Sequence, residues 1–267
     1  MNFISTLRTF GFLAVALAVA VAPSLAHDWE DCDGWEEDHD WGSKGRFCET
    51  REMTLPASGS VVVDAGHNGG IRVHGSEQNN IDLEVRIQVW ERSEDDAREI
   101  AQAIEILTDG NRIKADGPTK DGWSVSYRLR VPRQTDLDLE AHNGGISIED
   151  VTGQLRASTR NGGLSLAALA GDVQAETTNG GVHVELRGDH WEGKGLDVET
   201  RNGGVKVSIP EDYSAELETG TVNGRVNIDF PVTVQGQIGR EIATTLGNGG
   251  APVRVMTKNG GVTISRH

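Results

Sequence analysis

The chain has 267 residues, with 34 glycines and only 5% aromatic residues, and its formal net charge is −16 at pH 7. This acidity argues against nucleic acid and anionic lipid as partners, because a polyanion is repelled by such a surface. Abundant glycine with few aromatic residues disfavours a single thick globular core and suits a thin core with many tight turns.

The segment 1–26 is a predicted secretory signal peptide. Arg8 supplies a positive start, 10–21 is apolar but short for a bilayer span, and Ser24-Leu25-Ala26 resembles a cleavage site. The alternative is an uncleaved membrane anchor, which the short apolar run disfavours. The remaining chain carries 24 basic and 41 acidic residues, a net charge of −17, with no later membrane-spanning segment. We expect an exported protein, located in the periplasm, at the cell surface or outside the cell.

The segment 27–52 is acidic, rich in tryptophan and contains both cysteines. In an oxidising compartment, Cys32 and Cys48 are expected to form a disulfide that closes a loop of about 15 residues and stabilises the fold by about 3 kcal/mol. Metal binding is the alternative, because carboxylates, thiolates, His27 and His39 are all metal ligands. The carboxylates lack the fixed offsets of a calcium loop. We therefore expect a disulfide-bearing cap or linker with no bound metal and no cofactor.

The segment 53–135 is predicted to form β-strands and one helix. Apolar and polar residues alternate over 61–65, 81–89 and 123–131, which is the period of half-buried strands. A helix is expected over about 93–108, because Ser93 can cap its free N–H groups and three acidic residues follow it. The apolar stripe of this helix is expected to pack on the strands.

The segment 136–267 repeats a strand, an Asn-Gly-Gly turn and a second strand. The tripeptide occurs seven times in the whole chain, and Asn223-Gly224-Arg225 is a near copy. The eight asparagines predicted to form structural turns are Asn68, Asn143, Asn161, Asn179, Asn202, Asn223, Asn248 and Asn259. We expect positive φ angles at these turns, which Asn and Gly tolerate. Asn68 fits the repeat poorly, so its turn is expected to belong to a capping or bulged strand.

The residues flanking each turn favour stacked coils. Positions two, four and six before the asparagine are apolar or Thr, as in Leu155, Ala157 and Thr159, and inward apolar positions resume after the turn. Asn-Gly also predicts hairpins, so an antiparallel β-sandwich or meander is the alternative. Only stacking explains why the same pattern of inward residues recurs after 18 residues. We therefore expect a mostly β protein: a β-solenoid of about 18–23-residue coils with Asn-Gly-Gly corners, preceded by a small strand region with one α-helix. Gly153 and Gly171 indicate a second corner.

Two motifs carry a family resemblance. The run 125–132 (Val-Ser-Tyr-Arg-Leu-Arg-Val-Pro) leads into the strand 137–144, and Thr-x-Asn-Gly-Gly-Val/Leu-x-Val units follow. Over roughly residues 53–266 the chain resembles a family of adhesin-like proteins related to auto-transporter adhesin head domains. The resemblance implies a repetitive β-helical fold on an exported bacterial protein, and it supplies no catalytic residues. The segment 27–52 lies outside the family pattern.

Outward side chains beside the turns form a predicted ligand ridge, which consists of His142, Arg160, His183, Arg201, Lys206 and Lys258. Such a ridge can bind an anionic glycan, although alternating charges also keep a flat sheet soluble. The sequence contains no nucleophile elbow and no phosphate loop.

We predict a non-catalytic adhesin-like or scaffold module of the bacterial cell envelope. The sequence does not identify its partner, and the candidates are a glycan and an envelope protein. The alternatives are a carbohydrate-active β-helix enzyme and an envelope metal-binding or sensor protein that uses the acidic segment 27–52.

Overall fold

The computed structural model describes Cys32 and residues 45–118, 121–231 and 240–267. The chain divides into two units, Met1–Asp38 and His39–His267, and every named strand and helix belongs to the second. The predicted signal peptide and most of the predicted acidic cap lie outside the described residues. Cys32 and Cys48 are both disulfide-bonded. No helix in the described residues has the length and apolar character to cross a membrane.

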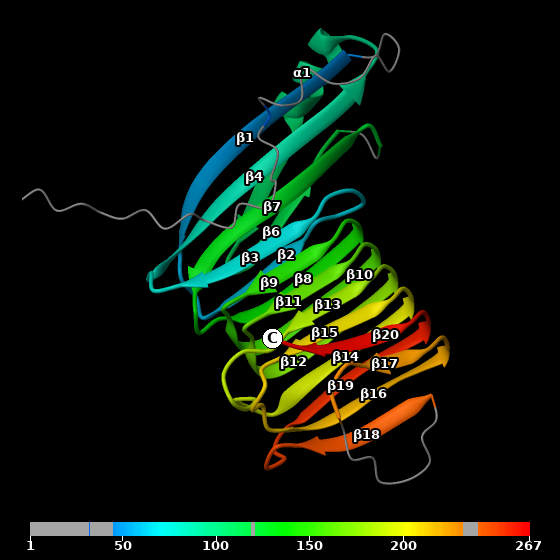
Figure 1. Ribbon diagram of the computed structural model, residues 1–267. Coiled ribbons are helices and arrows are strands. Elements are labelled where there is room, and N and C mark those ends of the chain that lie inside the picture. Colours follow the sequence, from blue (N-terminus) through cyan, green and yellow to red (C-terminus); the bar gives the residue numbers. More distant parts are fainter. Residues whose placement is uncertain (1–31, 33–44, 119–120, 232–239) are drawn as a thin grey trace, which may run out of the picture. The chain divides into compact units, whose positions relative to one another are not determined.

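Ten strands of the described chain form one sheet, called sheet A, in the order β1-β4-β7-β3-β9-β11-β13-β15-β20-β17 (Figure 1). Neighbours from β7 to β17 are parallel, and only β1–β4 and β4–β7 are antiparallel. The strands are β1 (Gly45–Pro56), β3 (Ile71–Ser76), β4 (Asn80–Glu91), β7 (Trp123–Pro132), β9 (Ile146–Glu149), β11 (Leu164–Ala167), β13 (Val182–Glu185), β15 (Val205–Ile209), β17 (Val226–Ile228) and β20 (Val262–Arg266).

The other ten strands described form sheet B, in the order β18-β16-β19-β14-β12-β10-β8-β2-β6-β5. Its neighbours are parallel except at the two ends, where β18–β16 and β6–β5 are antiparallel. The strands are β2 (Ser60–Asp64), β5 (Glu105–Asp109), β6 (Arg112–Asp116), β8 (Asp136–Asn143), β10 (Thr152–Asn161), β12 (Ala170–Asn179), β14 (Gly195–Asn202), β16 (Ala215–Asn223), β18 (Glu241–Leu246) and β19 (Pro252–Asn259).

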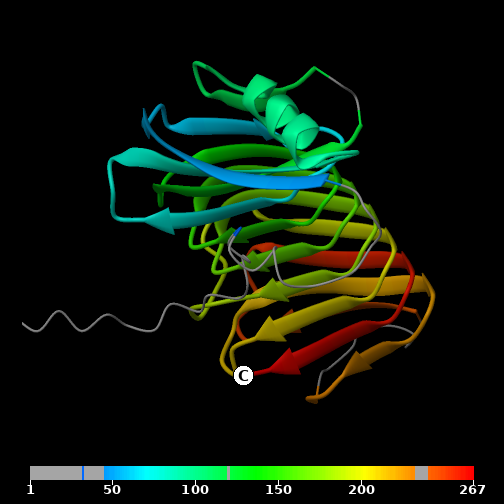
Figure 2. The same ribbon diagram turned by 90° about the horizontal axis from the view of Figure 1, so that it is seen from above.

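The prediction of a mostly β protein is confirmed, and the repeat strands pair in parallel. Alternate residues of both sheets are buried and belong to one hydrophobic cluster, so the core lies between the sheets (Figure 2). Leu155 and Ala157 in β10 and Leu164 in β11 are typical members, with exposed fractions of 4% or less. Parallel pairing excludes a meander of hairpins for these strands, because consecutive strands of a hairpin run antiparallel.

The helix α1 spans Glu94–Ala103 and begins as predicted, because the Ser93 side chain accepts a hydrogen bond from the Asp96 N–H. The predicted extent of about 93–108 is wrong at its C-terminal end. Ile104 already has an extended backbone, and β5 begins at Glu105. The apolar residues after Ile104, Ile106 and Leu107, are therefore half-buried in a strand. Their periodicity alone does not distinguish this strand from a longer helix.

Two predicted boundaries shift in the structure. The boundary between 52 and 53 falls inside β1, which pairs with β4 over its whole length, so 45–52 belongs to sheet A rather than to a linker. The predicted second corner also moves: Gly153 and Gly171 lie within β10 and β12. The chain turns just before these strands, where Asp150 and Ala168 have φ angles of 58° and 51°.

The C-terminal coil does not lie at the end of the stack. β19 lies between β14 and β16, and β20 lies between β15 and β17, so the last coil in sequence is inserted before the coil of β16 and β17 (Figure 1). β18 then covers the outer edge of β16 in the antiparallel direction. Stacking therefore follows the repeat pattern but not the sequence order.

Seven of the eight predicted turn asparagines are in register and form an Asn ladder. Its order along the stack is Asn68, Asn143, Asn161, Asn179, Asn202, Asn259 and Asn223. From Asn143 onward, each side-chain amide donates to the Oδ1 atom of the preceding asparagine, at 2.7–3.0 Å. Asn248 instead lies in the turn between β18 and β19. Four residues lead from Asp64 to Asn68 but three from its register partner Glu140 to Asn143, so β2 ends with one extra residue.

The corner glycines have a different role from the one we expected. None of the ladder asparagines has a positive φ, and among the glycines that follow them only Gly69 does. The first glycine is required by close stacking: a Cβ on Gly162 would lie 2.0 Å from the Gly144 carbonyl oxygen. The inward threonine of the same coil completes this contact, because Thr159 Oγ1 donates to that oxygen at 2.8 Å. Thr-x-Asn-Gly thus contacts the preceding coil through three separate groups.

Candidate binding surface

The six predicted ridge residues lie on two different faces. His142, Arg160, Arg201 and Lys258 directly precede ladder asparagines on sheet B, and we call them the cationic strip. His183 and Lys206 are register partners on sheet A. The Asn ladder runs between these two sets. The structure therefore does not place His183 beside Arg160 and Arg201 on one face.

The cationic strip begins at a stacked histidine pair. The imidazole rings of His67 and His142 have centroids 4.9 Å apart and an interplanar angle of 17°. Arg160, Arg201 and Lys258 then follow at the ends of strands β10, β14 and β19, and all three are exposed. In the described part of the chain, none of these three residues forms an ion pair. Their charges are available to a ligand.

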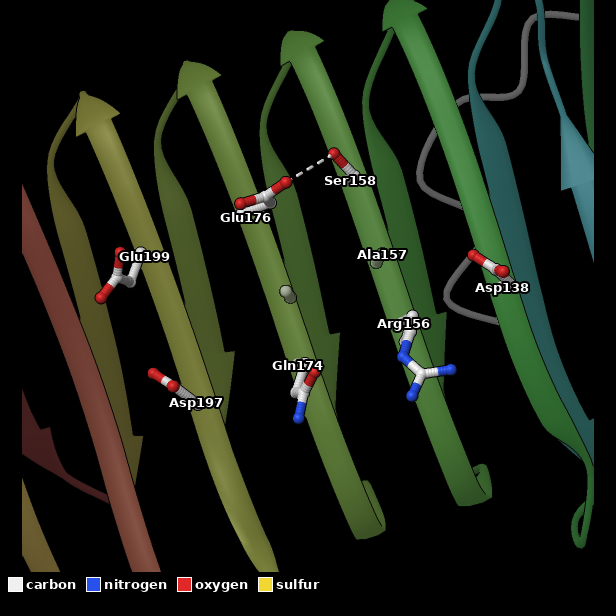
Figure 3. A pocket seen from close by; sticks show the side chains of 9 residues that line it. Asp138, Arg156, Ala157, Ser158, Gln174, Glu176, Asp197 and Glu199 are labelled. Atoms are coloured by element: carbon white, nitrogen blue, oxygen red, sulfur yellow. Dashed lines mark hydrogen bonds between the residues drawn. The ribbon is translucent and has the colours of Figure 1, made fainter.

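The middle of the outer face of sheet B is acidic. A shallow groove of about 470 Å³ crosses β8, β10, β12 and β14, and Figure 3 shows its side chains standing on neighbouring strands. Register places the polar side chains of this groove, together with Glu140 beside them, in two rows, which we call the acidic rows: Asp138-Arg156-Gln174-Asp197 and Glu140-Ser158-Glu176-Glu199. Ser158 Oγ donates to Glu176 at 3.2 Å (Figure 3). The groove is open and polar.

Arg254 in β19 closes the acidic rows on one side. Its Nη1 atom lies 2.6 Å from Asp197 and 2.5 Å from Glu199, and its Nε atom lies 3.9 Å from Glu218. Partial burial by itself would lower the pKa of Arg254. Hydrogen bonds to Glu199 and Asp197, together with their charges, raise the pKa overall. Arg254 thus neutralises its acidic neighbours. Its guanidinium group is already ion-paired, unlike Arg160, Arg201 and Lys258 of the cationic strip.

A second groove, of about 440 Å³, lies between the acidic rows and the cationic strip. Thr178, Arg201 and Lys258 line one side, and Met256 and Val222 contribute apolar surface. Val222 is 51% exposed and is the exposed large apolar side chain of the described residues. This groove therefore combines cationic groups with a small apolar patch.

A cationic pair also lies on the outer face of sheet A. Arg72 in β3 is the register partner of Arg128 in β7. Burial lowers the pKa of Arg72, and the nearby charge of Arg128 lowers it further. Sequence reasoning did not bring these residues together, because 56 positions separate them and only the pairing of β3 with β7 makes them neighbours.

His74, Glu149 and Asp150 form a cluster whose potential ligand atoms lie within 4.8 Å of one another. Two guanidinium groups share it: Arg133 lies 3.5 Å from Asp150, and Arg187 lies 3.6 Å from Glu149 and 3.7 Å from Asp150. These cations already compensate the carboxylates. The cluster is therefore a surface ion-pair network in which a metal ion would have to displace arginine.

Together, the two parallel-rich sheets and the Asn ladder define a repeat β protein that carries charged side chains on its outer faces. Residues 128–265, more than half of the chain, match the Toastrack DUF4097 family. The chain belongs to this family. This match does not extend to auto-transporter adhesin head domains, so that part of the predicted resemblance stays a prediction.

Solved structures with low sequence identity resemble the chain. One, described as a "putative cell adhesion protein" from Clostridium sporogenes, has 10% identity and a TM-score of 0.45 and covers 83% of this chain and 100% of its own. A "putative adhesin" from Bacteroides fragilis has 11% identity, coverages of 83% and 97% and a TM-score of 0.37. A "putative lipid binding protein" from Parabacteroides distasonis has 11% identity, coverages of 81% and 96% and a TM-score of 0.38. No curated protein matches the chain.

Proposed function

We propose that this protein is a non-catalytic binding module, exported to the bacterial cell envelope, which binds a linear anionic polymer such as an acidic glycan along the cationic strip. Its architecture in this proposal is a β-solenoid whose coils of about 18–23 residues turn at Asn-Gly-Gly corners. The corners supply rigidity, and the side chains beside them supply recognition.

The observation that carries this proposal is the set of unpaired cations on an acidic protein. Arg160, Arg201 and Lys258 form no ion pair within the described residues, whereas Arg254 on the same face contacts three carboxylates. For a cation that has no acidic partner, contact with a ligand costs less free energy, because no existing ion pair must break. Each of these unpaired groups also directly precedes an asparagine of the Asn ladder.

The spacing suits an extended ligand rather than a small one. Neighbouring strands of a sheet lie about 4.8 Å apart, so the seven members of the Asn ladder span roughly 29 Å. Arg160 and Arg201 belong to strands β10 and β14, which are two positions apart, and Lys258 belongs to the next strand, β19. A polymer that lies along the ladder can contact all three, while a monosaccharide can contact only one or two.

The acidic rows beside the strip give the surface selectivity. They repel a polyanion that lies across the sheet, and the strip attracts one that lies along the corner. Both effects act within about 10 Å at moderate salt, because ions screen exposed charges beyond that distance. A ligand with regularly spaced negative charges therefore fits this surface better than a densely charged polyanion.

Charge reversal tests the proposal. The triple variant Arg160→Glu, Arg201→Glu, Lys258→Glu should weaken binding to an immobilised acidic polysaccharide about 3- to 150-fold, since three exposed ion pairs contribute about 0.2–1 kcal/mol each. The measurement is a glycan array followed by calorimetry on the polysaccharide that binds best. Unchanged affinity would overturn the proposed surface.

A matched control separates the strip from general electrostatics. Arg98, Arg112 and Lys114 lie on α1 and β6, outside the strands that carry the cationic strip, and their reversal to Glu changes the net charge by the same amount. This control variant should keep most of the affinity. Equal losses in both variants would show that net charge, rather than the strip, governs binding.

A further inference from the structure

The open end of the Asn ladder differs chemically from its interior. An inner asparagine such as Asn161 takes part in four ladder hydrogen bonds around its peptide. Its amide donates to Asn143, its Oδ1 accepts from Asn179, its carbonyl accepts from the Gly144 N–H, and the following Gly162 N–H donates to the Asn179 carbonyl. Each bond resists rotation of this peptide.

At Asn223, the last member of the ladder, the described residues form only two of these four bonds. Its amide donates to Asn259 at 2.7 Å, and its carbonyl accepts from the Gly260 N–H at 3.1 Å. No described residue donates to its Oδ1 or accepts from the Gly224 N–H. β18 pairs with β16, the strand that ends at Asn223, as far as Gly220. Arg240 then contacts Thr221 and Val222, whereas Asn223 and Gly224 are exposed.

We propose that Asn223 is a site of spontaneous modification, at which the chain cyclises through a succinimide and loses the side-chain amide. The backbone nitrogen of Gly224 attacks Cγ of Asn223 and gives up its proton. The Cγ–NH2 bond breaks, and the nitrogen leaves as ammonia. Water then opens one of the two imide carbonyls, which yields aspartate or isoaspartate. The reaction requires only water and involves no change of oxidation state.

The fold protects the other Asn-Gly pairs because it occupies the attacking nitrogen. The glycine N–H after Asn68, Asn143, Asn161, Asn179, Asn202 and Asn259 donates in each case to the asparagine carbonyl of the next coil, at 3.0–3.1 Å. At Asn248, which lies outside the ladder, the Gly249 N–H donates to the Leu246 carbonyl at 2.9 Å. Only Gly224, among these eight glycines, has an N–H without a hydrogen bond to the described residues.

Modification at Asn223 weakens its hydrogen bonds to the neighbouring coil at Asn259 and Gly260. Aspartate cannot donate to the Oδ1 of Asn259, and isoaspartate adds a methylene to the main chain, which displaces the carbonyl that accepts from the Gly260 N–H. Asn259 then resembles an open end itself. The modification should therefore proceed from Asn223 to Asn259 and not begin inside the ladder.

Ageing of the full folded chain tests this proposal. The protein is incubated in mildly alkaline buffer, and peptide mapping by mass spectrometry measures amide loss and isoaspartate at all eight Asn-Gly pairs in the same sample. We expect Asn223 to react about tenfold or more faster than Asn161, because two fewer hydrogen bonds must break before attack. Equal rates at Asn223 and Asn161 in the folded protein would overturn the proposal.

Sequence context needs its own control, since Asn223 precedes Gly-Arg and the others precede Gly-Gly. In the chain unfolded with denaturant, the rates at the two sites should become similar. The variant Arg225→Gly, which removes the sequence difference at an exposed position, should keep the preference for Asn223 when folded. A preference that persists unchanged in denaturant, or that disappears in R225G, would assign the effect to sequence and would refute the structural protection.

Discussion

The corners at Asn161 and Asn223 have nearly the same sequence but opposite surroundings. Asn161 has a coil on both sides, whereas Asn223 has a ladder neighbour only at Asn259. The second corner glycine of an inner coil faces the next coil: a Cβ on Gly163 would lie 3.1 Å from the Gly181 carbonyl oxygen. At the last corner, where no next coil of this kind is described, the same position is Arg225. The second position therefore holds glycine at Gly163, where the next coil lies close, and arginine where no next coil is described.

The strongest test of this comparison is Gly162→Ala. Its Cβ would lie 2.0 Å from the Gly144 carbonyl oxygen and 2.4 Å from the carbonyl carbon, so two backbones would have to separate. We expect a loss of about 4 kcal/mol in the free energy of unfolding, which is in the range of severe steric changes. Urea unfolding followed by circular dichroism measures this loss. A variant as stable as the parent would show that the coils are not held at this distance.

A smaller effect is expected when the ladder itself is cut. Asn161→Val removes two side-chain hydrogen bonds, whereas Asn223→Val removes one. Because each bond contributes about 0.5–1.5 kcal/mol, the inner substitution should destabilise the fold by about 1–3 kcal/mol and the outer one by about half as much. Neither effect involves a positive φ, since neither asparagine has one. Equal losses at both sites in urea unfolding would show that the hydrogen-bonded ladder contributes little.

Most of the repeat region was predictable because its periodicity reports burial directly. Leu155, Ala157 and Thr159 were expected to face inward, and all three are buried. The insertion of β19 and β20 between earlier strands was not predicted. The pattern of inward residues identifies equivalent coils but does not specify their order in space. One signal was present and unused: the change from Gly to Arg225 indicates a coil without a neighbour on that side.

The N-terminal region was less predictable. Charged residues such as Glu49, Arg51 and Glu52 interrupt the apolar pattern of β1, an edge strand whose side chains are only partly buried. Arg51 is nonetheless anchored, because it donates to the carbonyls of Ala101 and Ile104 at the end of α1. Such a long-range polar contact has no local sequence signal. The candidate surface shows the same limit, since the ridge residues were identified but their division between two sheets was not.

The inward threonines offer a third test, with an expected effect near 1 kcal/mol. Thr177 Oγ1 donates to the Gly162 carbonyl at 2.8 Å, and the side chain is 4% exposed. Thr177→Val keeps the shape and removes this hydrogen bond, which contributes about 0.5–1.5 kcal/mol. Thermal unfolding should show a lower melting temperature. Thr263→Val is the control, because that side chain is exposed on sheet A and should leave the melting temperature nearly unchanged.

The smallest change is expected at the second corner glycine of an inner coil. A Cβ on Gly181 would lie 3.5 Å from the Gly204 carbonyl oxygen, which is an ordinary contact, and Gly181 has no positive φ. Alanine at such a position restricts the unfolded chain and stabilises a fold by about 0.4–1 kcal/mol. Gly181→Ala should therefore be neutral or slightly stabilising in urea unfolding, although Gly180→Ala, one residue earlier, places a Cβ 1.9 Å from the Gly162 oxygen. If both substitutions destabilise equally, the corner needs glycine for its backbone conformation rather than for close stacking.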